Sequence, residues 1–170
     1  MKLAVSVVCF VMTLAWLFAT ADELALGSQR VQLKAQARAC YLGFIKLYDI
    51  DYFADPADGA GARCVRVSYL RGFSADELGE ATFKVFRERH GDALTQRYRA
   101  QLTEVESAYR SVQSGDRYTY CVNDSDSGIL MRDGSSVISF SSDDFAERFL
   151  QIWVKRERQG GEPEWGFGSC

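Results

Sequence analysis

Histidine is nearly absent from this 170-residue sequence, which contains His90 alone. Hydrolytic triads use a histidine as general base, and many of them place the nucleophile in a G-x-S-x-G turn, which the chain also lacks. Glycine motifs that cradle phosphate groups do not occur either. The sequence therefore gives little support to a serine hydrolase and none to a P-loop or dinucleotide-binding enzyme. His90 precedes Gly91 at the expected end of a helix, so we expect it to interact with the last helical carbonyls.

An excess of positive charge is also missing. The chain has 20 lysines and arginines against 23 acidic residues, a net charge of −3 with histidine neutral. Binding to nucleic acid phosphates requires a basic face. Nucleic acid is therefore not an expected partner.

Long hydrophobic runs are confined to the N-terminus. Lys2 is followed by LAVSVVCFVMTLAWLFA and then by Ala19-Thr20-Ala21, an A-x-A site before Asp22. This pattern predicts a signal peptide over residues 1–21 and a secreted or periplasmic protein. The run is long enough that an uncleaved anchor is the alternative, and only then is a membrane an expected partner. Cleavage would remove Lys2 and no acid, so the mature charge becomes −4.

Cysteine is scarce and never arranged as C-x-x-C, so a metal site is the weakest interpretation. The predicted mature chain keeps Cys40, Cys64, Cys121 and Cys170. An even number of cysteines in an oxidising compartment predicts disulfides, with three possible pairings. Free buried thiols are the second alternative.

Hydrophobic periodicity predicts an α+β domain over residues 22–158, in which an antiparallel sheet is covered on one face by helices. Ser74 and Glu77 form the sequence pattern of a capping box, and Asp133-Gly134 is a strong hairpin signal. Strands are expected over 31–53, 64–70, 117–122 and on both sides of Asp133-Gly134, and helices over 74–90, 93–112 and 141–153. Residues 159–170, rich in glycine and aromatic residues, are predicted to form a flexible tail.

Acidic pairs offer weak catalytic or metal-binding candidates. Asp49 and Asp51 share a strand face near its end, where solvation is the plainer role. Asp143 and Asp144 lie at an expected helix N-terminus, where acids are favoured by the helix dipole. Neither pair is expected to form a metal or catalytic site.

The stretch GFIKLYDIDYF contains a cation among apolar residues. As a strand it places Phe44, Lys46, Tyr48, Ile50 and Tyr52 on one face, with Cys40 and Leu42 before them. Lys46 could extend its ammonium into water, or lie in a cleft that binds an anionic ligand. A buried ion pair is the third interpretation.

Four segments form a recognisable set in order and spacing: FIKLYDIDYF, SYLRGFSADELGEA, VQSGDRY and DDFAERFLQIW. Together they resemble the secreted, non-plant branch of the chalcone isomerase-like proteins. The resemblance implies an open-faced β-sandwich in which an antiparallel sheet packs against helices. It also implies either an isomerase that closes a flavanone ring or a relative that binds fatty acids through an arginine and a tyrosine.

The resemblance argues against ring closure. Tyr48 stands where the enzymes have an active-site threonine, and Gln36 stands where they have the catalytic arginine. Arg38 lies two residues further along, and Tyr98 and Tyr109 are candidates for the helical tyrosine. Without the cation that polarises the reacting oxygens, chalcone cyclisation is not expected.

We therefore expect a non-catalytic protein without cofactor or metal that binds a hydrophobic or amphipathic small molecule, such as a fatty acid, between sheet and helices. Arg38, Lys46 and Tyr48 are the expected polar contacts, and Phe44 and Tyr98 the expected walls. One alternative is an isomerase or lyase that uses Arg38 and a tyrosine as acid and base. The other is a structural or interaction protein of the envelope with a filled core.

Overall fold

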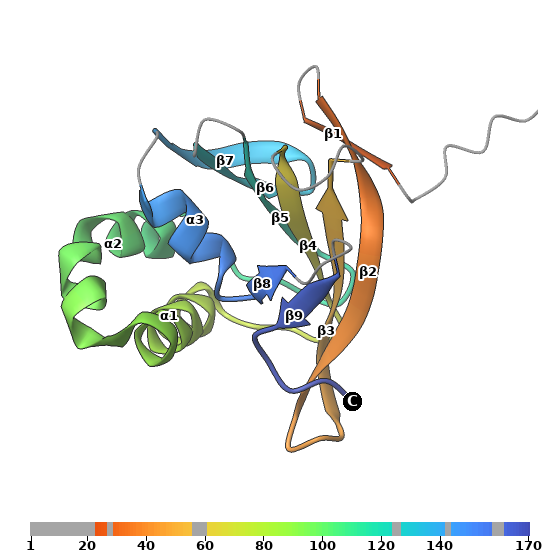
Figure 1. Ribbon diagram of the computed structural model, residues 1–170. Helices are drawn as coiled ribbons and strands as arrows, with labels where there is room; N and C mark the ends of the chain where they lie inside the picture. The colour runs from red at the N-terminus through yellow and green to blue at the C-terminus, as the bar shows by residue number, and fades with distance from the viewer. Residues whose placement is uncertain (1–22, 27–28, 56–60, 124–126, 142–143, 158–161) are drawn as a thin grey trace, which may run out of the picture.

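A curled antiparallel sheet of seven strands, with helices on one face, forms the body of the protein (Figure 1). The computed structural model describes residues 23–26, 29–55, 61–123, 127–141, 144–157 and 162–170. The strands follow one another in chain order across the sheet, β1 to β7, and β8 and β9 form a separate two-stranded sheet. The elements are β1 Glu23–Leu26, β2 Gln29–Tyr41, β3 Ile45–Ala54, β4 Arg63–Tyr69, α1 Ala75–Arg97, α2 Arg99–Ala108, β5 Arg117–Val122, β6 Gly128–Arg132, β7 Ser135–Phe140, α3 Asp144–Leu150, β8 Val154–Glu157 and β9 Pro163–Trp165. The predicted α+β class is confirmed.

Strand β3 begins later than the sequence pattern predicts. The chain reverses at Leu42 and Gly43, whose φ angles of 54° and 77° are left-handed. Phe44 lies in this turn, so neither it nor Cys40 continues the strand that carries Tyr48. The prediction of one continuous strand through Leu42 is therefore wrong. Glycine readily adopts a left-handed conformation, and this conformation ends a strand.

Helix α1 begins with the predicted capping box. The Ser74 hydroxyl accepts a hydrogen bond from the Glu77 backbone N–H at 3.2 Å, and the Glu77 carboxylate accepts one from the Ser74 N–H at 2.7 Å. The predicted end at Gly91 is a kink with φ of 81°, after which the chain continues as helix to Arg97. A second break, between α1 and α2, falls at Tyr98, and α2 ends at Ala108, before the predicted Val112.

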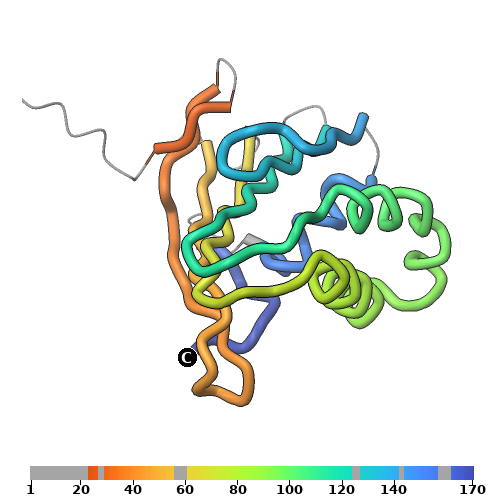
Figure 2. Tube along the Cα trace, turned by 180° about the vertical axis from the view of Figure 1, so that it is seen from behind, coloured from red at the N-terminus to blue at the C-terminus, as the bar shows by residue number. Residues whose placement is uncertain are grey.

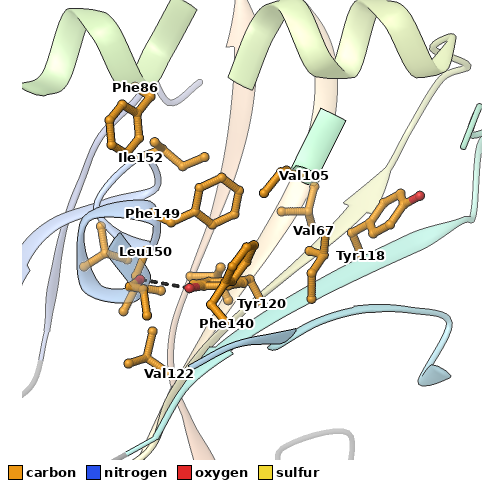
Figure 3. Close-up of a cluster of buried hydrophobic side chains, with 14 of the residues drawn as sticks. Val67, Phe86, Val105, Tyr118, Tyr120, Val122, Phe140, Phe149, Leu150 and Ile152 are labelled. Atoms are coloured by element: carbon orange, nitrogen blue, oxygen red, sulfur yellow. Dashed lines mark hydrogen bonds between the residues drawn. The ribbon is translucent and has the colours of Figure 1, made fainter. Parts of the chain in front are cut away.

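The main core lies between the helices and the inner face of the sheet (Figure 3). The rings of Phe149 and Tyr120 pack edge to face with centroids 4.8 Å apart. The Tyr120 hydroxyl donates to the Ala146 carbonyl at 2.9 Å. This bond satisfies a polar group that burial would otherwise make costly. Helix α3 ends at Leu150, earlier than predicted, and Ile152 is buried just beyond it.

A smaller apolar cluster covers part of the outer face of the sheet. Cys64 of β4 lies opposite Cys121 of β5, and a disulfide joins them with a Cα–Cα distance of 4.1 Å. Val31 and Phe53 pack beside them with no exposed surface. The disulfide therefore joins two central strands within a buried apolar cluster.

The C-terminal segment differs from the predicted loose tail. Residues 163–165 form β9 against β8, and the chain end then pairs with β2. Figure 2 shows the C-terminus beside the β2–β3 hairpin, where a disulfide joins Cys170 to Cys40. The prediction of disulfides is confirmed, and this second one keeps residues 162–170 on the sheet. In the described part of the chain, no helix has the length and apolar character needed to span a membrane.

Candidate functional site: a tyrosine-lined cavity

A cavity of about 310 Å³ lies between the inner face of the sheet and helix α1. This volume is at the lower end of the range, roughly 300–1,000 Å³, of sites for small organic ligands. The segment after α3 and the C-terminal segment line the cavity on the other side. The lining residues are mostly aliphatic and aromatic: Leu47, Tyr48, Val67, Tyr69, Phe73, Glu77, Leu78, Ala81, Thr82, Val85, Tyr109, Ile152, Trp153, Gly166 and Phe167.

Two tyrosines form the sheet wall of the cavity. Tyr48 of β3 lies directly opposite Tyr69 of β4, so both side chains are on the same face. Their rings meet edge to face with centroids 6.2 Å apart. Neither hydroxyl has a hydrogen-bond partner among the described residues, whereas the hydroxyl of neighbouring Tyr118 accepts from the Arg110 N–H at 2.9 Å. The sheet therefore presents two phenol groups to the cavity with their hydrogen-bonding capacity unused by the described residues.

The helical side contributes a third phenol. The Tyr109 ring packs edge to face against Tyr118 with centroids 5.3 Å apart. Its hydroxyl lies 3.0 Å from the Thr82 hydroxyl, and either group can donate. Both residues line the cavity. This pair links α1 to the segment that follows α2.

Burial raises the pKa of all three phenols. The pKa of Tyr48 rises to about 12 because burial disfavours the phenolate. Burial also raises the pKa of Tyr109 to about 12. The pKa of Tyr69 lies well above its usual value through burial and the neighbouring phenols of Tyr109, Tyr48 and Tyr118. All three stay uncharged at neutral pH and can both donate and accept hydrogen bonds.

One charged residue, Glu77, is found among the described residues that line the cavity. Hydrogen bonds from Ser74 lower the pKa of Glu77, with a smaller effect from nearby Arg71. The carboxylate is thus ionised and already holds the N-terminus of α1. No lysine or arginine lines the described cavity.

The C-terminal segment packs closely against the cavity. Phe167 lies edge to face with Tyr48, with centroids 5.9 Å apart. Gly166 donates its N–H to the Trp153 carbonyl at 2.7 Å, and its own carbonyl accepts from Arg89 Nη2 at 2.7 Å. A side chain at Gly166 would overlap the Arg89 guanidinium. Only glycine fits at this position without a shift of its neighbours.

The structure does not bring the five predicted ligand contacts together. Tyr48 lines the cavity, but Arg38 is on the outer face, where it donates to Asp49 at 2.5 and 3.0 Å. Tyr98 is 3 % exposed beneath the helices, and its hydroxyl donates to Asp144 at 3.0 Å. Arg38 and Tyr98 therefore each pair with an acidic side chain of the protein itself.

The two remaining predicted contacts lie at the β2–β3 hairpin. Phe44 is 72 % exposed in its turn, and Lys46 is exposed close by. Strand β4 first pairs with β3 at Tyr48, so this end of the hairpin projects beyond the sheet. Lys46 therefore extends its ammonium into water, which is the first of the three interpretations that the sequence allowed.

His90, Asp51 and Asp144 take structural positions, whereas Asp143 lies outside the described residues. Nε2 of His90 lies 2.9 Å from the Arg148 carbonyl of α3, so its partner is not the end of its own helix as predicted. Asp51 accepts from Arg66 at 2.7 Å on the outer face. No cluster of three metal-binding side chains occurs in the described ranges.

Sequence reasoning missed Tyr69, Thr82 and Phe167 as cavity residues. Tyr69 continues the alternation of Val65 and Val67 in β4, so its inward direction could have been read from the strand pattern. Thr82 lies one turn after Leu78 on the predicted apolar face of α1. No local signal marks Phe167, because its place depends on a disulfide from the far end of the chain.

Comparison with known proteins finds similarity in structure and none in sequence. No protein-family model matches the sequence, and no curated protein matches it. The structure is similar to a crystal structure of a fatty-acid binding protein from Arabidopsis thaliana, with a TM-score of 0.58 and 13 % sequence identity. The match covers 78 % of this chain and 83 % of that chain. The chain therefore has the chalcone isomerase-like α+β fold.

Proposed function

We propose that this protein binds a hydrophobic or amphipathic small molecule, with a fatty-acid-like chain, in the cavity between the sheet and α1 without transforming it. The observation that carries this proposal is the cavity of about 310 Å³ with apolar walls and a few polar groups. Small-molecule sites commonly combine these features. The structural neighbour, a fatty-acid binding protein, is consistent with this use of the fold.

Secretion is part of the proposal. The hydrophobic start of the chain motivates it, although residues 1–22 lie outside the described residues. Two disulfides are compatible with an extracellular or periplasmic compartment, where they persist. N-terminal sequencing of the exported protein should begin at Asp22, and a start at Met1 would contradict cleavage.

The alternatives have less support. An isomerase that uses Arg38 and a tyrosine needs both groups at one point of a cleft. Arg38 is paired with Asp49 on the outer face, away from Tyr48 and Tyr69. A structural protein with a filled core would have no space of this size beside α1.

A fluorescence titration tests the proposal. N-phenyl-1-naphthylamine is an uncharged apolar dye whose emission rises in a dry site, and it should bind the wild-type protein at micromolar concentration. Val85→Phe adds volume inside the cavity and should weaken dye binding at least about tenfold. Val137→Phe makes the same change at an exposed position of β7 and should leave binding unchanged. Absence of binding to the wild type, or equal binding to both variants, would reject the proposal.

A further inference from the structure

We propose that the cavity takes an uncharged amphiphile whose acceptor oxygen, in a carbonyl, ester or ether group, is held by the hydroxyls of Tyr48 and Tyr69. This inference rests on the proposed function and specifies the head group of the ligand. The same lining residues disfavour an ionised carboxylate.

The two hydroxyls provide the recognition. Tyr48 and Tyr69 face each other across the β3–β4 pair, and both line the cavity. The neighbouring Tyr109 and Tyr118 have partners for their hydroxyls, Thr82 and the Arg110 N–H. Tyr48 and Tyr69 have none among the described residues, and their hydroxyl oxygens are not fully buried, so they are open to a ligand that enters the cavity. A ligand oxygen between the two phenols would accept from both.

The charge state of the phenols matches a neutral partner. Burial raises the pKa of Tyr48 to about 12 and that of Tyr69 well above its usual value, so both are donors at any physiological pH. Phenols can donate to a neutral carbonyl at little desolvation cost. They cannot supply the positive charge that a buried carboxylate requires.

The charges around the cavity disfavour an anion. Glu77 is the one ionised residue among the described lining residues, and it is negative. Arg71 is exposed, and its guanidinium carbon lies 5.8 Å from the centre of the Phe73 ring. Arg89 lies against Gly166 and donates to its carbonyl, and it does not line the cavity. A carboxylate entering the cavity would lose hydration and find no cation among the described lining residues to compensate.

Arg89 is the group that could overturn this inference. Its Nη1 is buried and has no hydrogen-bond partner among the described residues. If Gly166 moved, the guanidinium could receive an anionic head. The experiment therefore includes Arg89→Gln, together with Arg71→Gln at the exposed position beside Glu77.

The test is competition against N-phenyl-1-naphthylamine at pH 8 with methyl decanoate and decanoate, which share one chain and differ in head-group charge. Methyl decanoate should displace the dye at a concentration at least about tenfold lower. Tyr48→Phe and Tyr69→Phe should each weaken methyl decanoate about three- to tenfold relative to the dye, whose own affinity is measured for each variant. Tyr41→Phe, the same change on the exposed hairpin, should alter neither ligand.

The pH dependence separates the two head groups further. Carboxylic acids titrate at about pH 4–5, so the neutral fraction of decanoic acid rises about 100-fold between pH 8 and pH 6. Its apparent affinity should rise with that fraction, whereas methyl decanoate should keep the same affinity.

Three results overturn the inference. The first is tighter binding of decanoate than of methyl decanoate at pH 8, especially if Arg89→Gln or Arg71→Gln abolishes it. The second is unchanged ester binding in both tyrosine variants, with the dye still bound. In both results dye binding shows that the proposed function survives. Failure of the dye and of both decanoyl compounds to bind would reject the proposed function, and the head-group inference with it.

Discussion

Cys170, the last residue of the chain, is joined by a disulfide to Cys40 of β2, with a Cα–Cα distance of 5.8 Å. The Cys40 N–H donates to the Gly168 carbonyl at 3.2 Å, so the segment also pairs with the strand. Phe167 is thereby held against Tyr48 on the cavity wall. The disulfide therefore joins the C-terminal segment to β2 close to the cavity.

Cys170→Ser should weaken both the fold and the site. Loss of a disulfide that closes a long loop typically lowers the free energy of unfolding by about 2–4 kcal/mol. Release of Phe167 should also lower dye affinity several-fold, because one wall would no longer be fixed. Urea unfolding and dye titration on the same preparation measure the two effects. Wild-type affinity in the variant would show that the disulfide does not hold the wall.

Phe44→Ser should have almost no effect. The side chain is 72 % exposed at the hairpin, so the free energy of unfolding should change by less than about 0.5 kcal/mol. Dye affinity should stay the same, because Phe44 does not line the cavity. A clear loss of affinity would show that Phe44 contacts the ligand, as the sequence pattern predicted.

Tyr120→Phe should destabilise the core without changing binding. The Tyr120 hydroxyl donates to the buried Ala146 carbonyl at 2.9 Å, and its removal leaves that acceptor without this donor. The expected loss is about 1–3 kcal/mol in the free energy of unfolding, measured by urea denaturation. Tyr41→Phe, on the exposed hairpin, is the control and should be neutral. Equal stability of the two variants would contradict the assigned hydrogen bond.

Glu77→Gln should lower stability at neutral pH and not at low pH. The pKa of Glu77 is lowered below its usual 4.5, first by hydrogen bonds from Ser74. A carboxylate whose pKa is lower in the folded state stabilises the fold above its unfolded pKa, and the effect disappears as the pH falls through the folded value. Unfolding of both proteins at pH 7 and pH 3 should give a difference at pH 7 alone. A difference of equal size at pH 3 would contradict the ionised cap.

Local sequence patterns predicted much of the fold. The capping box of Ser74 and Glu77 and the turn at Asp133-Gly134 both occur as predicted, because each depends on residues within a few positions. The strand turn at Gly43 was missed, since alternating residues continue on both sides of it. The left-handed break at Gly91 was placed correctly, and helix resumes after it up to Arg97.

The site was harder to predict, because it depends on contacts between distant segments. Alternation placed Tyr48 on the inner face, which the cavity confirms as its location. The same rule could not show that the hairpin end projects beyond β4, so Phe44 and Lys46 were assigned to that face. Phe167 lies against Tyr48 in a segment held by the Cys170–Cys40 disulfide, one of three pairings that the sequence allowed, and by the hydrogen bonds of Gly166.

Native mass spectrometry of the full chain as purified tests the central claim most directly. The wild-type protein should retain one small-molecule ligand per chain, and Val85→Phe, with the cavity filled, should retain none. A wild-type protein whose mass equals that of the chain alone even after incubation with methyl decanoate, or the same bound mass in both proteins, would contradict a binding site at this cavity.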